Sequence, residues 1–143
     1  MKPSYCVMVK ETLVVSCKRA NLKRIRTFVA QTLAPFGLPE IQLNQLILAV
    51  DEVCANFIIH SNHEDETKTI QLAITGSPAE VQFDVSDNAP AYHPGSYHEP
   101  NLKDLIQQGR KGGVGMMLVN RIMDKVEFRS IKGRNVCRLY KRL

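Results

Sequence analysis

Three short segments, in a fixed order along the chain, hold the residues whose types and spacing could do chemistry. Glu52 and Asn56 stand four residues apart in a long apolar stretch, Asp87 follows a strand-like run, and a glycine-rich run occupies residues 112–115. Together they offer a carboxylate base, an amide for a metal ion, an acceptor for an adenine amino group and backbone N–H groups for phosphates. Each segment alone is weak, but the three in this order favour a nucleotide site.

The first segment combines a polar pair with an apolar stripe at helical spacing. The stripe consists of Leu43, Leu46, Ile47, Val50, Val53, Cys54 and Phe57. Glu52 and Asn56 fall together on the opposite side, one turn apart. That side is also apolar, because Leu48, Ala49, Ala55 and Ile59 surround the pair. A carboxylate and an amide are costly there unless a metal–phosphate group pairs with them. For this segment alone, an i, i+4 polar pair on a partly exposed helix is the simpler interpretation.

The second segment is Asp87, which ends the alternating apolar run of residues 80–87. An aspartate between a strand and a proline-containing loop is commonly a turn-forming residue. The functional alternative is a carboxylate that accepts a hydrogen bond from the exocyclic amino group of a purine. The small side chains of Ala89 and Ala91 would then let the ligand approach closely.

The third segment opens a helix-like run with Gly113, Val114 and Gly115. Glycines let backbone N–H groups converge at a helix N-terminus, where the helix dipole favours an anion. The preceding Lys111 adds a charge suited to a terminal phosphate. The run matches neither a Walker A loop nor a dinucleotide-binding fingerprint, and a flexible hinge is the alternative.

Hydrophobic periodicity predicts the elements that must position these residues. An opening strand or hairpin is predicted at residues 5–15. Further strands are predicted at residues 69–75, 80–87, 125–131 and 135–141, and helices at residues 20–34, 39–60 and 114–123. Residues 88–112 break the pattern with prolines and glycines, and a connection this long in a compact domain is usually a functional loop or lid, about residues 90–112. The order of elements predicts an α+β two-layer sandwich, with helices on one face of a mixed, mainly antiparallel sheet.

Composition indicates one ordinary globular domain over residues 1–143, with 44% hydrophobic and 23% charged residues. No apolar run approaches membrane-spanning length and the N-terminus lacks a signal-peptide core, so we expect a cytoplasmic protein without a membrane partner. The four cysteines are scattered, which favours buried free thiols over a disulfide framework or a zinc site.

The net charge of +5 is unevenly distributed. Residues 40–104 carry eleven acids against two lysines, a balance of −9, whereas residues 18–26 hold five bases and no acid. Residues 121–142 hold eight bases against two acids. A nucleic-acid binder would have to use these basic segments. Because they lack interleaved aromatic residues, solvated faces or an acidic protein partner fit better, and we do not expect direct nucleic-acid binding.

Taken together, the segments resemble the Bergerat-fold (GHKL) ATP-binding domains of gyrase, heat-shock protein ninety, histidine kinases and mismatch-repair ATPases. Glu52 and Asn56 stand where that family has its N box, Asp87 where it has its first acidic glycine-rich box, and Gly113 and Gly115 where it has the second. The details are similar to the small stand-alone branch, the anti-sigma-factor serine-protein kinases of bacterial sporulation and stress response. Residues 49–56 read much like the N box of that branch.

One departure concerns the first glycine-rich box, which reads Asp-x-Gly-x-Gly in the family. Here both glycines are alanine, at Ala89 and Ala91. Alanine disfavours a positive φ, so we expect a lower nucleotide affinity than is usual for the family.

The resemblance implies a role for each matching residue. Glu52 would be the general base, Asn56 would ligate Mg²⁺ at the ATP phosphates, and Asp87 would hold the adenine amino group. The ATP site would be completed by Ala89, Ala91, Lys111, Gly113, Val114 and Gly115.

The resemblance also implies a function: an ATP-dependent serine/threonine-protein kinase of the anti-sigma type. Such a protein would sequester a sigma factor and phosphorylate a small anti-anti-sigma (STAS-type) protein, and the resemblance suggests a homodimer. One alternative is a nucleotide-sensing partner switch that binds its target without kinase activity. A detached histidine-kinase catalytic domain is a further alternative, although the chain has no room for a dimerisation helix pair carrying a phosphoacceptor histidine.

Overall fold

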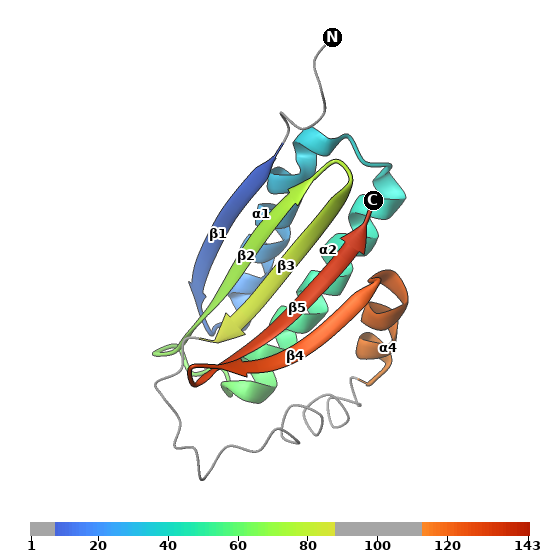
Figure 1. The fold of residues 1–143 in the computed structure, drawn as a ribbon. Coiled ribbons are helices and arrows are strands. Elements are labelled where there is room, and N and C mark those ends of the chain that lie inside the picture. Colours follow the sequence, from blue (N-terminus) through green and yellow to red (C-terminus); the bar gives the residue numbers. More distant parts are fainter. Residues whose placement is uncertain (1–7, 88–112) are drawn as a thin grey trace.

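A five-stranded sheet with three α-helices on one of its faces forms the part of the chain that the computed structural model describes, residues 8–87 and 113–143 (Figure 1). The strands are β1 (Val9–Ser16), β2 (Thr69–Ser77), β3 (Glu80–Asp87), β4 (Lys125–Ile131) and β5 (Arg134–Arg142). Their order in the sheet is β1-β2-β3-β5-β4. The predicted α+β two-layer sandwich is therefore confirmed.

The sheet is antiparallel in all its described pairs, and the expectation of a mixed sheet was wrong in this detail. A strand that follows a helical crossover would run parallel to β3 if it paired with it. Instead, the last hairpin joins the sheet through its second strand, β5, so that β3 has an antiparallel neighbour. The register pairs Val85 of β3 with Cys137 of β5.

The helices are α1 (Leu22–Leu33), α2 (Glu40–Ala55) and α4 (Gly113–Ile122). Short 3₁₀ turns flank α1 at Arg19–Asn21 and Ala34–Phe36, and Gly37 then reverses the chain with a φ of 63°. Pro39, the predicted first residue of the helix, is the N-cap of α2, which begins one residue later at Glu40. None of the described helices combines the length and the apolar character that a bilayer crossing requires.

The end of α2 differs from the regular helix predicted to about His60. The α-helix ends at Ala55 and continues as the π-helical segment η4 (Asn56–Ser61). Asn62 closes this segment, because its backbone N and its Nδ2 both donate to the carbonyl oxygen of Phe57, at 3.0 and 2.9 Å. Single π turns within helices are frequent at functional sites, and this one begins at Asn56.

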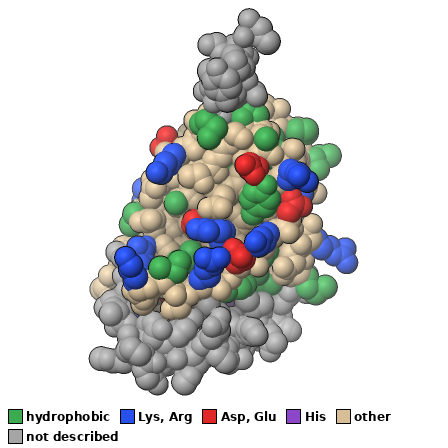
Figure 2. All heavy atoms as spheres, viewed as in Figure 1, with side chains coloured by type: hydrophobic (Ala, Val, Ile, Leu, Met, Phe, Trp, Pro, Cys, Tyr) green, Lys and Arg blue, Asp and Glu red, His purple; other side chains and the backbone are tan. Residues whose placement is uncertain are grey.

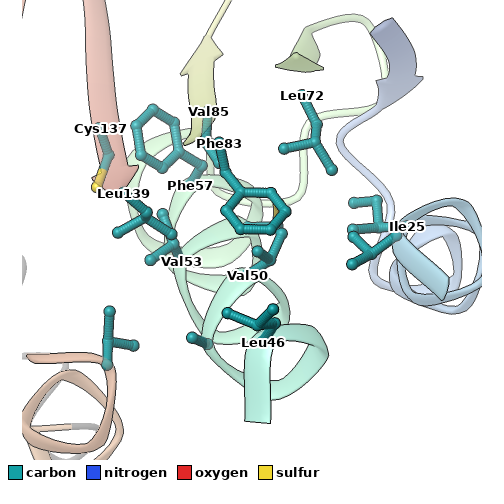
Figure 3. Close-up of a cluster of buried hydrophobic side chains, with 14 of the residues drawn as sticks. Ile25, Leu46, Val50, Val53, Phe57, Leu72, Phe83, Val85, Cys137 and Leu139 are labelled. Atoms are coloured by element: carbon teal, nitrogen blue, oxygen red, sulfur yellow. The ribbon is translucent and has the colours of Figure 1, made fainter. Parts of the chain in front are cut away.

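The core lies between the inner face of the sheet and the helices, and Figure 3 shows its centre. Its fully buried side chains include Ile25, Leu46, Val50, Val53, Leu72, Phe83 and Leu139. Three cysteines, Cys17, Cys54 and Cys137, are free and buried, as predicted. Burial raises the pKa of the Cys54 and Cys137 thiols, which makes them unreactive packing residues. Cys6, the expected lid at 90–112 and the predicted site residues Ala89, Ala91 and Lys111 lie outside the described residues.

Candidate functional site

Helices α2 and α4 meet where Glu52 lies against the backbone of Gly115. A Cβ atom added to Gly115 would lie 2.8 Å from the Cγ of Glu52 and closer still to its carboxylate. Any larger residue at position 115 would therefore have to displace the Glu52 side chain. The structure thus brings together two of the predicted site residues that are far apart in sequence. Gly113 and Val114 precede Gly115 as the first residues of α4.

The Glu52 carboxylate is half-buried and has neither a hydrogen bond nor an ion pair within the described part of the chain. Burial raises the pKa of Glu52, and the negative charge of Asp51 raises it further, while His60 acts in the opposite direction. A carboxylate kept without a partner in a partly apolar site is a candidate proton acceptor. The side of the helix around Glu52 is more open to water than predicted, because Leu48 is 45% exposed. Ala49, by contrast, is fully buried as part of the core.

Asn56 lies at the junction of α2 and η4, one turn after Glu52. Its backbone N–H donates to the carbonyl oxygens of Glu52 and Val53, so the two side chains share one side of the helix. The side-chain amide of Asn56 is half-buried and forms no hydrogen bond with any described residue. Its oxygen is thus available to a ligand. The next residue, Phe57, belongs to the same core cluster as Val85 of β3 (Figure 3).

Among the described residues, no group of three His, Cys, Asp or Glu side chains could hold a metal ion. The amide oxygen of Asn56 is a donor that fits Mg²⁺ better than a transition metal. Mg²⁺ is usually held by one or two protein oxygens together with substrate phosphates and water, so it does not need a dedicated protein cage. The free amide oxygen of Asn56 suits that mode of binding.

Asp87 ends β3 and is only 3% exposed, and its carboxylate is held by one residue of β5. The backbone N of Asn135 donates to Oδ1 of Asp87 at 3.2 Å, and Nδ2 of Asn135 donates to Oδ2 at 3.1 Å. These two bonds fix the orientation of the carboxylate. They favour a recognition role over a simple turn-forming aspartate, which would bond to its own loop.

Asn135 leaves a buried acceptor beside Asp87. Because its Nδ2 is turned toward the carboxylate, its Oδ1 is fixed as well, and this atom is buried without a hydrogen-bond partner. An unpaired buried acceptor costs about 1–3 kcal/mol, so a ligand donor would relieve a real penalty. An amino group with two N–H donors, such as that of adenine, could serve both the Asp87 carboxylate and this oxygen.

Sequence reasoning missed Asn135, although a signal was present. Cys137 and Leu139 of β5 point into the core, and strand alternation therefore turns Asn135 to the same side. A polar residue at an inward position of an apolar strand calls for a partner, and here the partner is Asp87. Within the described chain, no hydrogen bond or ion pair joins Asp87 to Glu52 or Asn56. The two halves of the site are linked by the core packing of Phe57 and Val85.

Comparison with known proteins gives consistent results. Residues 15–141 match the family model of the histidine kinase-like ATPase domain. The chain is 25% identical over 125 residues to the serine-protein kinase RsbW of Halalkalibacterium halodurans, which covers 85% of this chain and 76% of that protein. It is also similar to a crystal structure of the RsbU and RsbW domains of Rv1364c from Mycobacterium tuberculosis, with a TM-score of 0.66 and 14% identity.

The structural match covers 94% of this chain but only 32% of the solved chain. The chain thus spans about a third of that solved protein, and the likeness concerns the fold. The resemblance to GHKL ATP-binding domains is confirmed by the family match and by this fold.

Proposed function

Since the chain belongs to the histidine kinase-like ATPase domain family, we propose that it is an ATP-dependent serine/threonine-protein kinase of the anti-sigma type. It would sequester a sigma factor and phosphorylate an anti-anti-sigma (STAS-type) protein on serine or threonine, in the cytoplasm where transcription takes place. The similarity to a protein named serine-protein kinase RsbW supports this choice within the family.

The observation that carries the proposal is the half-buried, unpaired carboxylate of Glu52 against Gly115. A serine hydroxyl must lose a proton as it attacks a phosphoryl group, and a nearby carboxylate can accept that proton. The absence of a cation partner among the described residues keeps Glu52 free for this task. Its raised pKa makes the carboxylate a stronger base than an ordinary glutamate.

The other residues would bind and orient the nucleotide. Asp87 and Asn135 would receive the adenine amino group, and Asn56 would contribute an oxygen ligand to Mg²⁺. When bound, Mg²⁺ would neutralise phosphate charge. The N-terminal backbone of α4, at Gly113, Val114 and Gly115, would face the phosphates, as helix N-termini do for anions. The predicted contributions of Ala89, Ala91 and Lys111 remain part of the proposal.

The test compares Glu52→Gln with Asn56→Ala in two assays, phosphate transfer from labelled ATP to a partner encoded nearby and calorimetric titration with nucleotide. Glutamine keeps the volume and hydrogen-bonding capacity of Glu52 but accepts no proton. Transfer should fall by about 10²–10⁴-fold in Glu52→Gln, with little change in nucleotide affinity. Asn56→Ala should weaken Mg²⁺-dependent nucleotide binding itself. Undiminished transfer by Glu52→Gln would remove the catalytic role.

A second candidate is a nucleotide-sensing switch that sequesters its target without transferring phosphate. The alanines at positions 89 and 91, where the family has glycines, favour it, because they restrict the backbone beside Asp87. Wild-type protein that binds ATP and the sigma factor but phosphorylates no partner would support this second candidate. The variant Ala89→Gly/Ala91→Gly should then restore transfer if the glycines alone are missing.

A further inference from the structure

The face of the sheet opposite the helices has no helix on it in the described part of the chain (Figure 1). Its side chains are the residues of each strand that alternate with the core positions. Figure 2 shows Lys and Arg side chains gathered across the middle and lower part of this face, with Asp and Glu between them. An open sheet face with this much positive charge calls for an explanation beyond solubility.

A hollow of about 270 Å³ lies on this face where β3, β5 and the β4–β5 turn meet. It is lined by Asp84, Ser86, Lys132, Arg134, Val136 and Arg138, among others. The exposed Ile131 adds an apolar side chain to the lining. The hollow therefore combines cations with a small apolar surface.

The charges in the hollow do not cancel. Arg138 donates to both carboxylate oxygens of Asp84, at 2.8 and 3.1 Å, which neutralises that pair. Arg134 donates hydrogen bonds to two uncharged acceptors, the carbonyl oxygen of Asp87 at 3.1 Å and Oγ of Ser86 at 2.8 Å. Lys132 has no ion pair within the described residues. Two cations thus remain without a carboxylate.

The backbone at Lys132 supports a role for its charge. Lys132 and Gly133 have φ values of 51° and 80° and form the two-residue turn between the paired Ile131 and Arg134. Such a turn favours Asn-Gly, and a lysine in the left-handed conformation costs about 1–2 kcal/mol. Turn formation therefore does not explain a lysine at this position, whereas a binding role for the cation does.

We infer that this hollow docks an acidic segment of a partner protein. Lys132 and Arg134 would pair with its carboxylates, and Ile131 and Val136 would contact its apolar side chains. Nucleic acid fits less well, because the hollow has no aromatic side chain for base stacking. The docking inference does not depend on the proposed function. Only the effect of docking on nucleotide affinity rests on the proposed function.

Arg134 connects the hollow to the candidate site. It holds the main-chain oxygen of Asp87 from the open face, while the next residue, Asn135, holds the Asp87 carboxylate from the inner face. A partner carboxylate that draws Arg134 away would free one side of this clamp. Partner docking and nucleotide binding should therefore change each other's affinity by the same factor.

The test is calorimetric titration of the full chain, without nucleotide, with an acetylated peptide of alternating Glu and Leu. A peptide with Gln in place of Glu and a single-stranded oligothymidylate are the comparison probes. Lys132→Asn should weaken binding of the Glu peptide by about two- to fivefold. The thermal unfolding midpoint of this variant should equal or exceed that of the wild type, because asparagine suits the turn. Lys125→Asn is the matched control, because Lys125 pairs with Glu127 outside the hollow and should leave binding unchanged.

Two outcomes would support the inference: selective loss in Lys132→Asn, and preference for the Glu peptide over the Gln peptide. Arg134→Lys should keep most of the peptide affinity but lower the affinity for ATP, because lysine keeps the charge and loses the paired bonds to Ser86 and Asp87. No measurable peptide binding, equal binding by both peptides, or tighter binding of the oligothymidylate would overturn it. So would self-association that Lys132→Asn abolishes, which would make this face a contact between two copies of the chain.

Discussion

At Glu52 the requirements of stability and those of the proposed catalytic role oppose each other. Because its pKa is raised in the folded protein, the protonated form is favoured there, and ionised Glu52 lowers the free energy of unfolding. The contribution of protonated Glu52 to the stability of the fold is complete below the ordinary pKa of glutamate, about 4.3. It is lost as the pH rises through the raised pKa. A free carboxylate at neutral pH is thus retained at a cost in stability.

The first prediction is that Glu52→Gln makes the protein more stable at neutral pH while it lowers transfer by the factor given above. The neutral amide has no ionisation penalty, so its advantage over the wild type should be largest at pH 8 and should shrink toward pH 5. Urea unfolding of both proteins at these two pH values measures the difference. A variant that is less stable than the wild type at both would show that the carboxylate is stabilised by a partner.

The second prediction concerns Asn135, whose side chain orients Asp87 and presents a buried acceptor. Asn135→Leu should destabilise the fold by about 1–3 kcal/mol, because Asp87 loses a donor in a buried position. It should also reduce the preference for ATP over GTP, since guanine presents a carbonyl where adenine presents its amino group. Titration with both nucleotides tests this.

Asn120→Leu in α4 is the control for that prediction. Asn120 also donates from its side chain, to the carbonyl oxygen of Met116 at 3.0 Å, but it lies on an exposed part of the helix. Its replacement should leave the nucleotide preference unchanged. Equal ATP preference in Asn135→Leu and the wild type would remove Asn135 from base recognition.

At the scale of the elements, α4 approaches Glu52 of α2 closely because Gly115 has no side chain. Gly115→Ala should raise the helix propensity of α4 by up to about 1 kcal/mol, so the fold should persist. The new methyl group, however, would displace the Glu52 carboxylate, which is the flexible end of a long side chain. The third prediction is therefore a stable protein with transfer reduced as strongly as in Glu52→Gln.

Gly76→Ala provides the contrast to Gly115→Ala. A Cβ at Gly76 would lie 2.9 Å from the backbone oxygen of Glu80, which has no freedom to move aside. This variant should lose stability, whereas Gly115→Ala should lose activity. In the Glu52→Gln background, Gly115→Ala should add no further loss of transfer. An additional loss there would mean that Gly115 acts through something other than Glu52.

The sequence predicted every described strand and α-helix because their hydrophobic periods are clear, as in the stripe from Leu43 to Phe57. The π segment at Asn56–Ser61 was not predicted, since its winding depends on the closure by Asn62, which is a tertiary detail. The Glu52–Asn56 spacing predicted one half of the candidate site. Asn135 and Arg134 were missed because they act across β3 and β5, and only the strand register reveals that pairing.

On the scale of the whole molecule, the two faces of the sheet serve different purposes. The inner face packs on α1 and α2 and carries Asp87 at the end of the central strand β3, where the candidate nucleotide site lies. The outer face carries Lys132 and Arg134, neither of which pairs with a carboxylate of the described residues. Because Asp87 is bonded from both faces, the sheet itself would be the physical connection between the proposed nucleotide and the proposed partner.

The last prediction detects nucleotide binding through the thermal stability of the fold, without any partner protein. A ligand at 100 times its dissociation constant stabilises the folded state by about 2.7 kcal/mol, which corresponds to roughly 10 °C in a domain of this size. ATP with Mg²⁺ should produce this shift in the wild type, and GTP should produce much less. Chelating Mg²⁺ with EDTA should reduce the ATP shift, because the phosphate charge is then left unneutralised.

The assignment of Asn56 is tested by combining that measurement with Asn56→Ala. If the amide oxygen is the metal ligand, the variant should show a small ATP shift that EDTA no longer changes. Asp87→Ala should instead lose the difference between ATP and GTP while its remaining shift stays sensitive to EDTA. The two variants thus separate metal binding from base recognition in one thermal-melt assay. An ATP shift in Asn56→Ala that responds to EDTA as strongly as in the wild type would show that the metal is held elsewhere.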